Sequence, residues 1–304
     1  MSGANLGILA TRPRVTGAAK VATTPTWIER ARSRRSNRAK PTQLNPGYFM
    51  ADFDRNFTPR SGYGADQVTI DDGLRAYMLR VYNYMAGGVA LSGLVSWLTY
   101  QAAGGDAISV AGGRITGLSS FGQAIFSGPL TIVLFLVTLG IVFFMSFRID
   151  RLAPSTALAL FLAYAALLGL MLSAVFLAYT VSSISRTFFI SAASFGALSL
   201  YGYTTRRDLS PIGSFLIMGV FGLLLAIVVN IFLKSTGLDF AISVIGVLIF
   251  AGLTAWDTQR IKEMYSAMDD GTIAGRKAVM GALSLYLDFI NLFLFLLRFM
   301  GDRR

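Results

Sequence analysis

Two neighbouring apolar stretches near the C-terminus decide the fold: FAISVIGVLIFAGLTAWDTQRIKEMY at 240–265 and VMGALSLYLDFINLFLFLLRF at 279–299. Each is long enough to cross a bilayer as a helix, which takes ~20 mostly apolar residues. Each also contains one carboxylate, Asp257 in the first stretch and Asp288 near the middle of the second. A charged side chain at membrane depth is unfavourable by ~2.5–3.5 kcal/mol on insertion scales, and it usually faces a bundle interior or a water-filled path. We therefore predict two membrane helices whose carboxylates point away from lipid.

The composition of the whole chain is that of a membrane protein. Of its 304 residues, 54% are hydrophobic and only 14% are charged, whereas soluble proteins are about 25% charged. The chain has no cysteine and no histidine, which excludes thiol catalysis, a histidine general base and the usual zinc ligand sets. We therefore expect no enzyme and no cofactor.

The positive charge is concentrated at the N-terminus. Residues 1–49 contain nine Lys or Arg and one Glu, with no sustained apolar period. We interpret residues 1–65 as a disordered basic tail that contacts anionic lipid head groups or sets the orientation of the protein, not as a nucleic-acid-binding region. Residues 66–304 then form the transmembrane domain. Two alternatives stay open for the tail, namely an organellar transit peptide and a true start at Met50.

Apolar runs of span length follow one another from residue 81 to residue 299. We expect an all-α, polytopic membrane protein, a bundle of seven transmembrane helices, because no run alternates with the period of two of a membrane strand. The fourth run is rich in Ser, Ala and Gly, and we expect it to pack closely against its neighbours. The Gly-rich stretch after the first run reads as a flexible connection. The runs lie at 81–103, 129–147, 155–181, 187–205, 211–233, 240–265 and 279–299.

The distribution of positive charge predicts a cytoplasmic N-terminus. Arg75 and Arg80 precede the first run, and the connections that would lie on the same side carry most of the other Lys and Arg residues. The end of the chain fits less well. A complete seventh crossing places Arg298, Arg303 and Arg304 outside, so either the charge rule fails at this short terminus or the last segment does not cross fully.

The two carboxylates fall at similar depths in adjacent helices. Asp257 lies about two turns before the end of the sixth run, and Asp288 lies nine residues after Val279, ~14 Å along a helix. Two carboxylates in contact cannot both ionise cheaply, so they titrate as a pair; ionised, they offer oxygen ligands to a hard cation such as Ca²⁺. The alternative is that each merely pairs with a nearby group, such as Arg260 three residues after Asp257. Asn291, three residues after Asp288, is a candidate hydrogen-bond partner or packing contact.

Three segments resemble the Bax-inhibitor (transmembrane Bax-inhibitor-motif) family. They are GALSLYLDFINLFLFLLRFMGDRR at 281–304, TAWDTQRIK at 254–262 and SLYGYTTRRDLS at 199–210, and the resemblance covers about residues 72–301. It implies seven helices with a central last helix wrapped by the other six. It also implies an integral protein of the bacterial inner (plasma) membrane.

The resemblance further implies a pH-sensitive cation leak, chiefly of Ca²⁺. The gating pair of the family maps onto Asp257 and Asp288, which become the candidate Ca²⁺ ligands. A basic residue that closes the second span is expected to latch onto the first of these carboxylates, and here Arg148 is the candidate. The second run has no acidic residue of its own, which leaves an ion ligand there in doubt.

Two other functions compete with the leak. One is a non-conducting membrane regulator that binds a membrane protease or another membrane protein, with the basic tail as the segment that contacts the partner. The other is an intramembrane aspartyl protease, which also places two Asp residues on neighbouring spans. Such proteases carry a Gly-x-Gly pattern before the second Asp, whereas Leu285, Tyr286 and Leu287 precede Asp288. We therefore expect no protease activity.

Overall fold

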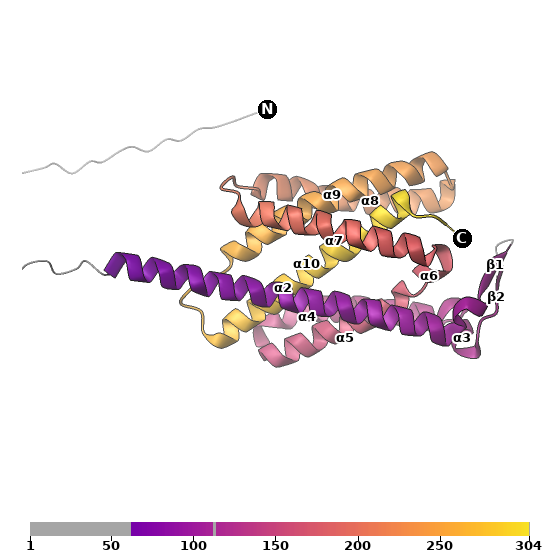
Figure 1. Ribbon diagram of the computed structural model, residues 1–304, viewed down its shortest axis with the longest axis horizontal. Coiled ribbons are helices and arrows are strands. Elements are labelled where there is room, and N and C mark those ends of the chain that lie inside the picture. Colours follow the sequence, from indigo (N-terminus) through magenta and orange to yellow (C-terminus); the bar gives the residue numbers. More distant parts are fainter. Residues whose placement is uncertain (1–61, 112–113, 304) are drawn as a thin grey trace, which may run out of the picture. The chain divides into compact units, whose positions relative to one another are not determined.

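The computed structural model describes residues 62–111 and 114–303, which are mostly helical (Figure 1). The tail prediction for residues 1–65 and the alternative start at Met50 thus lie outside the described residues, apart from residues 62–65, which begin the first helix. The long helices are α2 (Gly62–Ala103), α4 (Leu130–Arg148), α5 (Pro154–Leu172), α7 (Val181–Thr204), α8 (Ser210–Leu233), α9 (Thr236–Glu263) and α10 (Gly271–Met300). The short elements are η2 (Gly105–Ala107), β1 (Ser109–Ala111), β2 (Arg114–Thr116), α3 (Ser120–Ser127), η3 (Ile149–Arg151) and α6 (Val175–Ala178).

Five of the described helical segments are long and apolar enough to cross a membrane. They are α4, α5 together with α6, α8, α9 and α10. The prediction of a polytopic helical membrane protein is therefore confirmed. Helices α2 and α7, which correspond to the first and fourth runs, do not meet the same criteria, so the sequence-based count of seven spans is not reached.

Two details of the prediction need correction. The third run is not one helix, because α5 ends at Leu172 and the chain resumes helical geometry only in α6. The Gly-rich connection is a β-hairpin, not an unstructured link, so the fold is not purely α. Val110 pairs with Ile115 across this antiparallel hairpin, as suits β-branched residues, and Gly117 adopts the positive φ of 80° that ends it.

Local sequence fixes the start of the two helices that carry the carboxylates. The Ser235 hydroxyl accepts a hydrogen bond from the backbone N–H of Leu238 (3.3 Å), and the Asp270 carboxylate accepts one from Ile273 (2.7 Å). Such caps satisfy backbone donors that a helix N-terminus leaves free. Immediately before the first cap, Lys234 ends α8 in the left-handed conformation, with a φ of 51°. The position of each carboxylate along its helix follows from these starts.

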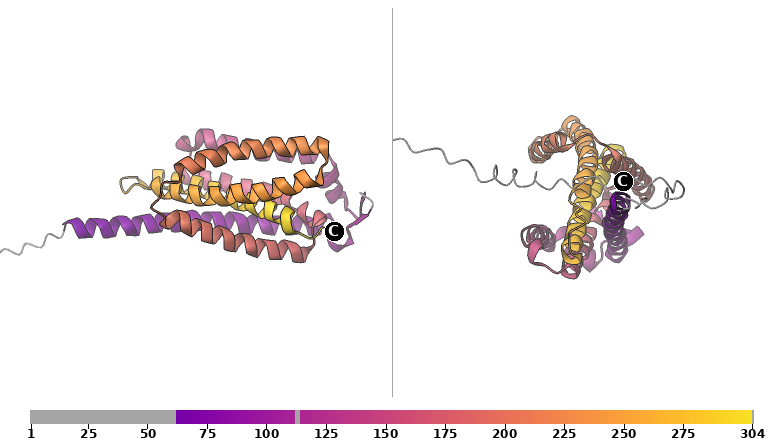
Figure 2. Two further views of the ribbon diagram at one scale, coloured as in Figure 1. Left: turned by 90° about the horizontal axis from the view of Figure 1, so that it is seen from above. Right: turned by 90° about the vertical axis from the view of Figure 1, so that its left-hand side faces the viewer.

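The long helices form two groups of three with α10 running obliquely between them (Figures 1 and 2). In one group α2 and α4 pack on α5, and in the other α7 and α8 pack on α9. Helix α10 contacts α2, α5, α7 and α9 and holds the two groups together. The last helix is central, as the family resemblance implies, but α4 and α8 pack mainly on α5 and α9, outside this core.

Each group contains one close helix crossing made at a glycine. A Cβ on Gly169 of α5 would come within 2.6 Å of the Ser92 carbonyl oxygen on α2. A Cβ on Gly202 of α7 would come within 2.1 Å of the Ala255 carbonyl oxygen on α9. Both distances are too short for any side chain, so glycine permits the backbones to approach, as small residues do in membrane bundles.

The C-terminal end of α10 is tied to the start of α9. Arg298 pairs with Asp239, and Arg303 pairs with the same carboxylate at 3.2 Å. The segment after α10 also forms an isolated β-bridge between Arg303 and Tyr179. At 30 residues, α10 is ~45 Å long, which is enough for a complete crossing. The basic side chains of Arg298 and Arg303 at this end are both paired with Asp239.

Candidate functional site

The structure brings Asp257 of α9 and Asp288 of α10 together. Their side chains contact one another closely enough to be joined by a hydrogen bond. Asp288 is only 5% exposed, and the helix on which it lies is the most buried of the candidate spans. Asp288 is thus buried and Asp257 half-buried, so the geometry agrees with the arrangement expected from the two stretches of sequence.

The hydrogen bonding of Asp288 is incomplete without an additional proton or cation. Within the described residues, its Oδ2 atom has no hydrogen-bond donor. A carboxylate only accepts hydrogen bonds, whereas a protonated carboxyl group also donates one. A bond between Asp257 and Asp288 therefore requires a proton on one of them. Such a pair could hold one proton or one cation.

A cavity of about 480 Å³ leads to this pair from one end of the bundle. Asp257 lines it, together with residues of α9, α10 and the η3 turn, while Asp288 lies outside the lining. Three basic side chains, Arg260, Arg276 and Lys277, also line the cavity. The pair thus has one carboxyl group in an accessible cavity and one in the packed interior.

Residues 74–304 match the family described as inhibitor of apoptosis-promoting Bax1. The chain belongs to this family. A protein of Rickettsia prowazekii is 46% identical over 255 residues, which are 84% of this chain and 100% of the relative. A protein of Caulobacter vibrioides is 43% identical over 258 residues, again 84% of this chain and 100% of the relative. The inner membrane protein YbhL of Escherichia coli K12 is 42% identical over 235 residues, 76% of this chain and 94% of that protein. The family resemblance seen in the sequence is confirmed, and the chain is an integral membrane protein.

The basic side chains of the cavity have different partners in this Bax-inhibitor family member. Arg276 donates through Nε to the Leu152 carbonyl at 2.6 Å. Lys277 donates through Nζ to Asp269 at 2.6 Å and to a backbone carbonyl of the preceding connection. Arg260 stacks on the ring of its neighbour Trp256, with its guanidinium carbon 5.4 Å from the ring centroid. Arg260 is also the positively charged side chain that interacts electrostatically with Asp257. Sequence analysis did not identify Arg276 and Lys277 as site residues, because their contacts are all with other elements.

Arg148, the residue predicted to bind Asp257, does not form an ion pair with it in the described residues. Arg148 is exposed at the end of α4, although the next residue, Ile149, lines the cavity that contains Asp257. In the part of the chain that the structure describes, no ion pair joins Arg148 to Asp257. The latch stays a prediction.

Asn291 makes a local hydrogen bond within α10. Its side-chain N–H donates to the Leu287 carbonyl one turn earlier in the same helix, at 2.8 Å. A helical residue three positions away lies on the same face, but this amide donor is used by the backbone. The supporting role expected for Asn291 toward Asp288 stays a prediction.

Sequence analysis did not predict a chain of hydroxyl groups that lies beside the pair of Asp257 and Asp288. The Tyr82 and Ser199 hydroxyls lie 2.7 Å apart, and Ser199 lies 2.9 Å from the hydroxyl of Thr258. Thr258 directly follows Asp257 and is completely buried. These contacts connect α2, α7 and α9 at the depth of the pair. Single Ser, Thr and Tyr residues in apolar runs are too common to be recognised as a network without the structure.

The pair alone offers an incomplete site for a divalent cation. Ca²⁺ takes 6–8 oxygen ligands, and among the described residues no group of three or more acidic side chains could hold a metal ion. Asp257 and Asp288 could supply part of such a shell, with water or backbone oxygens completing it.

Proposed function

We propose that this protein is a pH-sensitive cation leak channel, with Ca²⁺ as its main ion, gated by Asp257 and Asp288. The observation that supports the proposal is the contact between these two carboxyl groups, one of which, Asp257, lines a cavity. We also propose that α2 and α7 cross the membrane, giving seven spans. Their position beside α10, which α2 and α7 both contact, supports this.

The proposed gate works through the charge of the pair. With one shared proton, the two side chains attract each other and hold α9 against α10. Loss of that proton leaves two negative charges, whose repulsion is about 4 kcal/mol at ~4 Å and an effective dielectric constant of 20. Separation of the helices would relieve this repulsion and extend the cavity past Asp288. The leak should therefore increase as pH rises.

The proposed orientation places the cavity on the cytoplasmic side. The end of the bundle at which it opens carries the connections after α4, α7 and α9. These connections and the helix ends that adjoin them hold more than half of the Lys and Arg residues of the described chain, namely Arg148, Arg151, Arg206, Arg207, Arg260, Lys262, Arg276 and Lys277. The positive-inside rule assigns such an end to the cytoplasm. The start of α2 lies at this end (Figure 1), so the N-terminus would be cytoplasmic as well.

Ion flux into liposomes tests the proposal directly. Purified full-length protein is reconstituted, and Ca²⁺ uptake is measured between pH 6 and pH 8. We expect flux to rise with pH in the unmodified protein. Asp257→Asn and Asp288→Asn should each abolish the pH dependence, because neither variant can build up two charges. Asp106→Asn, which changes an exposed carboxylate in η2, serves as the matched control and should behave like the unmodified protein.

The outcomes distinguish an error in the proposed gating role of the pair from an error in the proposed leak activity. If both variants keep the flux and pH profile of the unmodified protein, the gating role of the pair is wrong. If folded, reconstituted protein passes no Ca²⁺ at any pH in this range, the leak itself is wrong, and the non-conducting regulator becomes the better hypothesis.

A further inference from the structure

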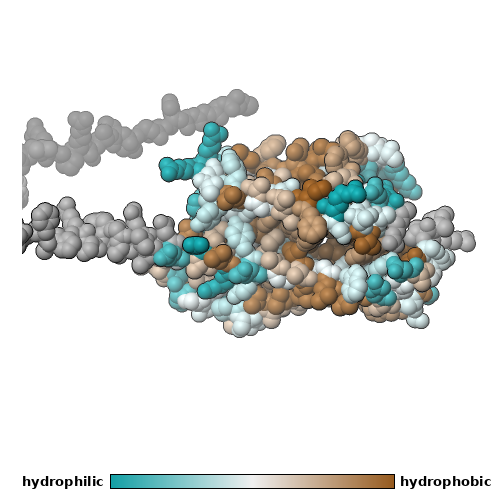
Figure 3. Space-filling model, viewed as in Figure 1, coloured by the Kyte–Doolittle hydropathy of each residue, from teal (hydrophilic) through white to brown (hydrophobic). Residues whose placement is uncertain are grey.

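One face of the bundle is open between α2 and α7. Figure 1 shows these helices side by side in front of α10, and they are not among the helix pairs that pack closely. Apart from the hydrogen bond between Tyr82 and Ser199, space remains between them. Figure 3 shows apolar side chains over the middle of this face and hydrophilic ones toward its ends.

A cavity of about 660 Å³ occupies the half of this face nearest the start of α2. We call it the α2–α7 groove; residues 75–86 of α2 and 195–203 of α7 contribute its lining. Most of the lining is apolar and open to the outside, with Leu79 52% exposed and Leu200 62% exposed. In a membrane protein this opening faces the hydrocarbon of the bilayer.

The dimensions of the groove match one leaflet. Eleven residues separate Arg75 from Ala86, the outermost residues of α2 in the lining, which is ~16 Å along a helix. The hydrocarbon core of a bilayer is ~30 Å thick, so one leaflet takes up about half of it. An acyl chain that enters at one end of the groove would therefore be covered over most of its leaflet.

Positive charge lies at one end of the groove only. Arg75 lines this end. Tyr203, also in the lining, is contacted by Lys262, whose Nζ donates to the Tyr203 carbonyl at 2.8 Å and lies 5.4 Å from its ring. An arginine side chain binds phosphate oxygens with two parallel hydrogen bonds. The groove thus combines an apolar slot with a cationic end at head-group depth.

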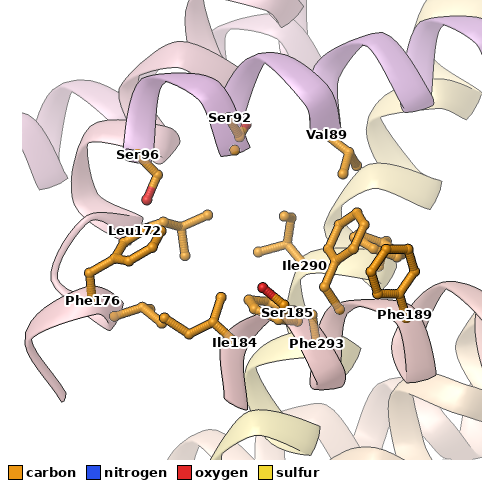
Figure 4. Close-up of a pocket in the computed structure, with 14 residues that line it drawn as sticks. Val89, Ser92, Ser96, Leu172, Phe176, Ile184, Ser185, Phe189, Ile290 and Phe293 are labelled. Atoms are coloured by element: carbon orange, nitrogen blue, oxygen red, sulfur yellow. The ribbon is translucent and has the colours of Figure 1, made fainter. Parts of the chain in front are cut away.

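The other half of the same face lacks this combination. A smaller cavity of about 330 Å³ lies there between α2 and α7, with α10 at its base (Figure 4). Its polar side chains are the serines Ser92, Ser96 and Ser185, and no charged side chain lines it. Charge complementarity therefore selects the α2–α7 groove and not this second cavity.

We propose that the α2–α7 groove binds one anionic phospholipid, with its phosphate on Arg75 and one acyl chain between the two helices. This site lies on the outside of the bundle and does not depend on the proposed leak. It rests on the proposal that α2 and α7 cross the membrane, with Arg75 near the head groups.

Native mass spectrometry of the full-length protein tests the proposal. The protein is taken from vesicles of equal phosphatidylglycerol and phosphatidylcholine into mild detergent, and retained lipid is counted. We expect one phosphatidylglycerol per chain. Gly196→Trp should remove it, because Gly196 lines the groove and has open space around it. Gly140→Trp places the same side chain at an equally open position on α4 and should retain the lipid.

A second pair of variants tests the charge without filling the groove. Arg75→Gln should reduce the preference for phosphatidylglycerol over phosphatidylcholine by about fivefold or more, because a charge-assisted hydrogen bond is lost. Arg151→Gln, at an exposed site outside the groove, should leave the preference unchanged. Equal lipid retention by the two tryptophan variants would overturn the proposal. So would a retained dimer that only Gly196→Trp dissociates, since a second chain would then fill the groove.

Discussion

Helices α4 and α10 differ in a way that reverses the rule for soluble proteins. Only 11% of the most apolar stretch of α4 is buried, and the same holds for α8, whereas 67% of that of α10 is buried. Yet α4 and α8 are the most apolar of the candidate spans, and α10, with Asp288 at its centre, is the least apolar. In water the most apolar helix would be the most buried.

The difference shows what drives packing in this bundle. Lipid tails are as apolar as leucine, so a purely apolar helix gains nothing by leaving the lipid. A helix with a carboxylate or several hydroxyl groups does gain, because its polar groups find partners only inside. Within a membrane domain of this kind, a lower apolar content therefore marks the core and the functional site.

The strongest test of this comparison is a pair of leucine deletions. Leu285 of α10 is completely buried, and Leu225 of α8 is 67% exposed. Leu285→Ala should lower the free energy of unfolding by about 2–5 kcal/mol, the range for buried leucines, whereas Leu225→Ala should change it by less than about 0.5 kcal/mol. Reversible unfolding in mixed micelles measures both. Equal effects would show that α8 is covered in the membrane, for example by another subunit.

A second test concerns backbone contact in place of side-chain packing. Gly202→Leu should destabilise the protein by about 1–3 kcal/mol, the usual effect of overpacking, because a carbonyl oxygen of α9 occupies the space for its Cβ. Gly140→Leu, on the lipid-facing α4 with nothing near its Cβ position, should be neutral or slightly stabilising. The same unfolding measurement applies. A harmless Gly202→Leu would mean that α7 and α9 are farther apart than the structure shows.

The smallest expected effect separates polar contacts inside the bundle from those at its surface. The Tyr286 hydroxyl lies 2.6 Å from that of Ser92, and both residues are buried. Tyr286→Phe should cost about 1 kcal/mol of unfolding free energy, the net value of one hydrogen bond. Tyr201→Phe, at a 49% exposed site, should have no measurable effect. If the two variants are equally stable, the hydroxyl pair does not contribute to holding α2 against α10.

The sequence predicted a polytopic helical membrane protein because length and apolar content are strong signals for a membrane helix, although only five of the seven predicted spans meet the criteria for a crossing helix in the described residues. It also predicted that Asp257 and Asp288 would meet, since an isolated carboxylate at membrane depth has to face the interior. The break between α5 and α6 was missed, because periodicity within a continuous apolar run does not show where a helix is interrupted. The hairpin was missed because its Gly-rich sequence hides two short β-branched segments.

The surroundings of the pair were less predictable for a physical reason. Arg276, Lys277 and Ser199 act through partners on other elements, and sequence spacing reveals only neighbours within one helix. The same limit explains Asn291, whose spacing correctly places it near Asp288 but does not show that its amide bonds to Leu287. Arg148 was expected to reach Asp257 from the end of α4, a position that depends on the register of the α4–α5 connection.

The tie between Arg303 and Asp239 has a practical consequence for work on this protein. A fluorescent reporter or affinity tag fused directly to the C-terminus would emerge beside this ion pair and beside the β-bridge to Tyr179. Steric competition there would loosen the last turn of α10, and functional assays on such fusions would report an altered molecule. A flexible spacer, or insertion into the exposed connection near Met268, which is 96% exposed, avoids this interference.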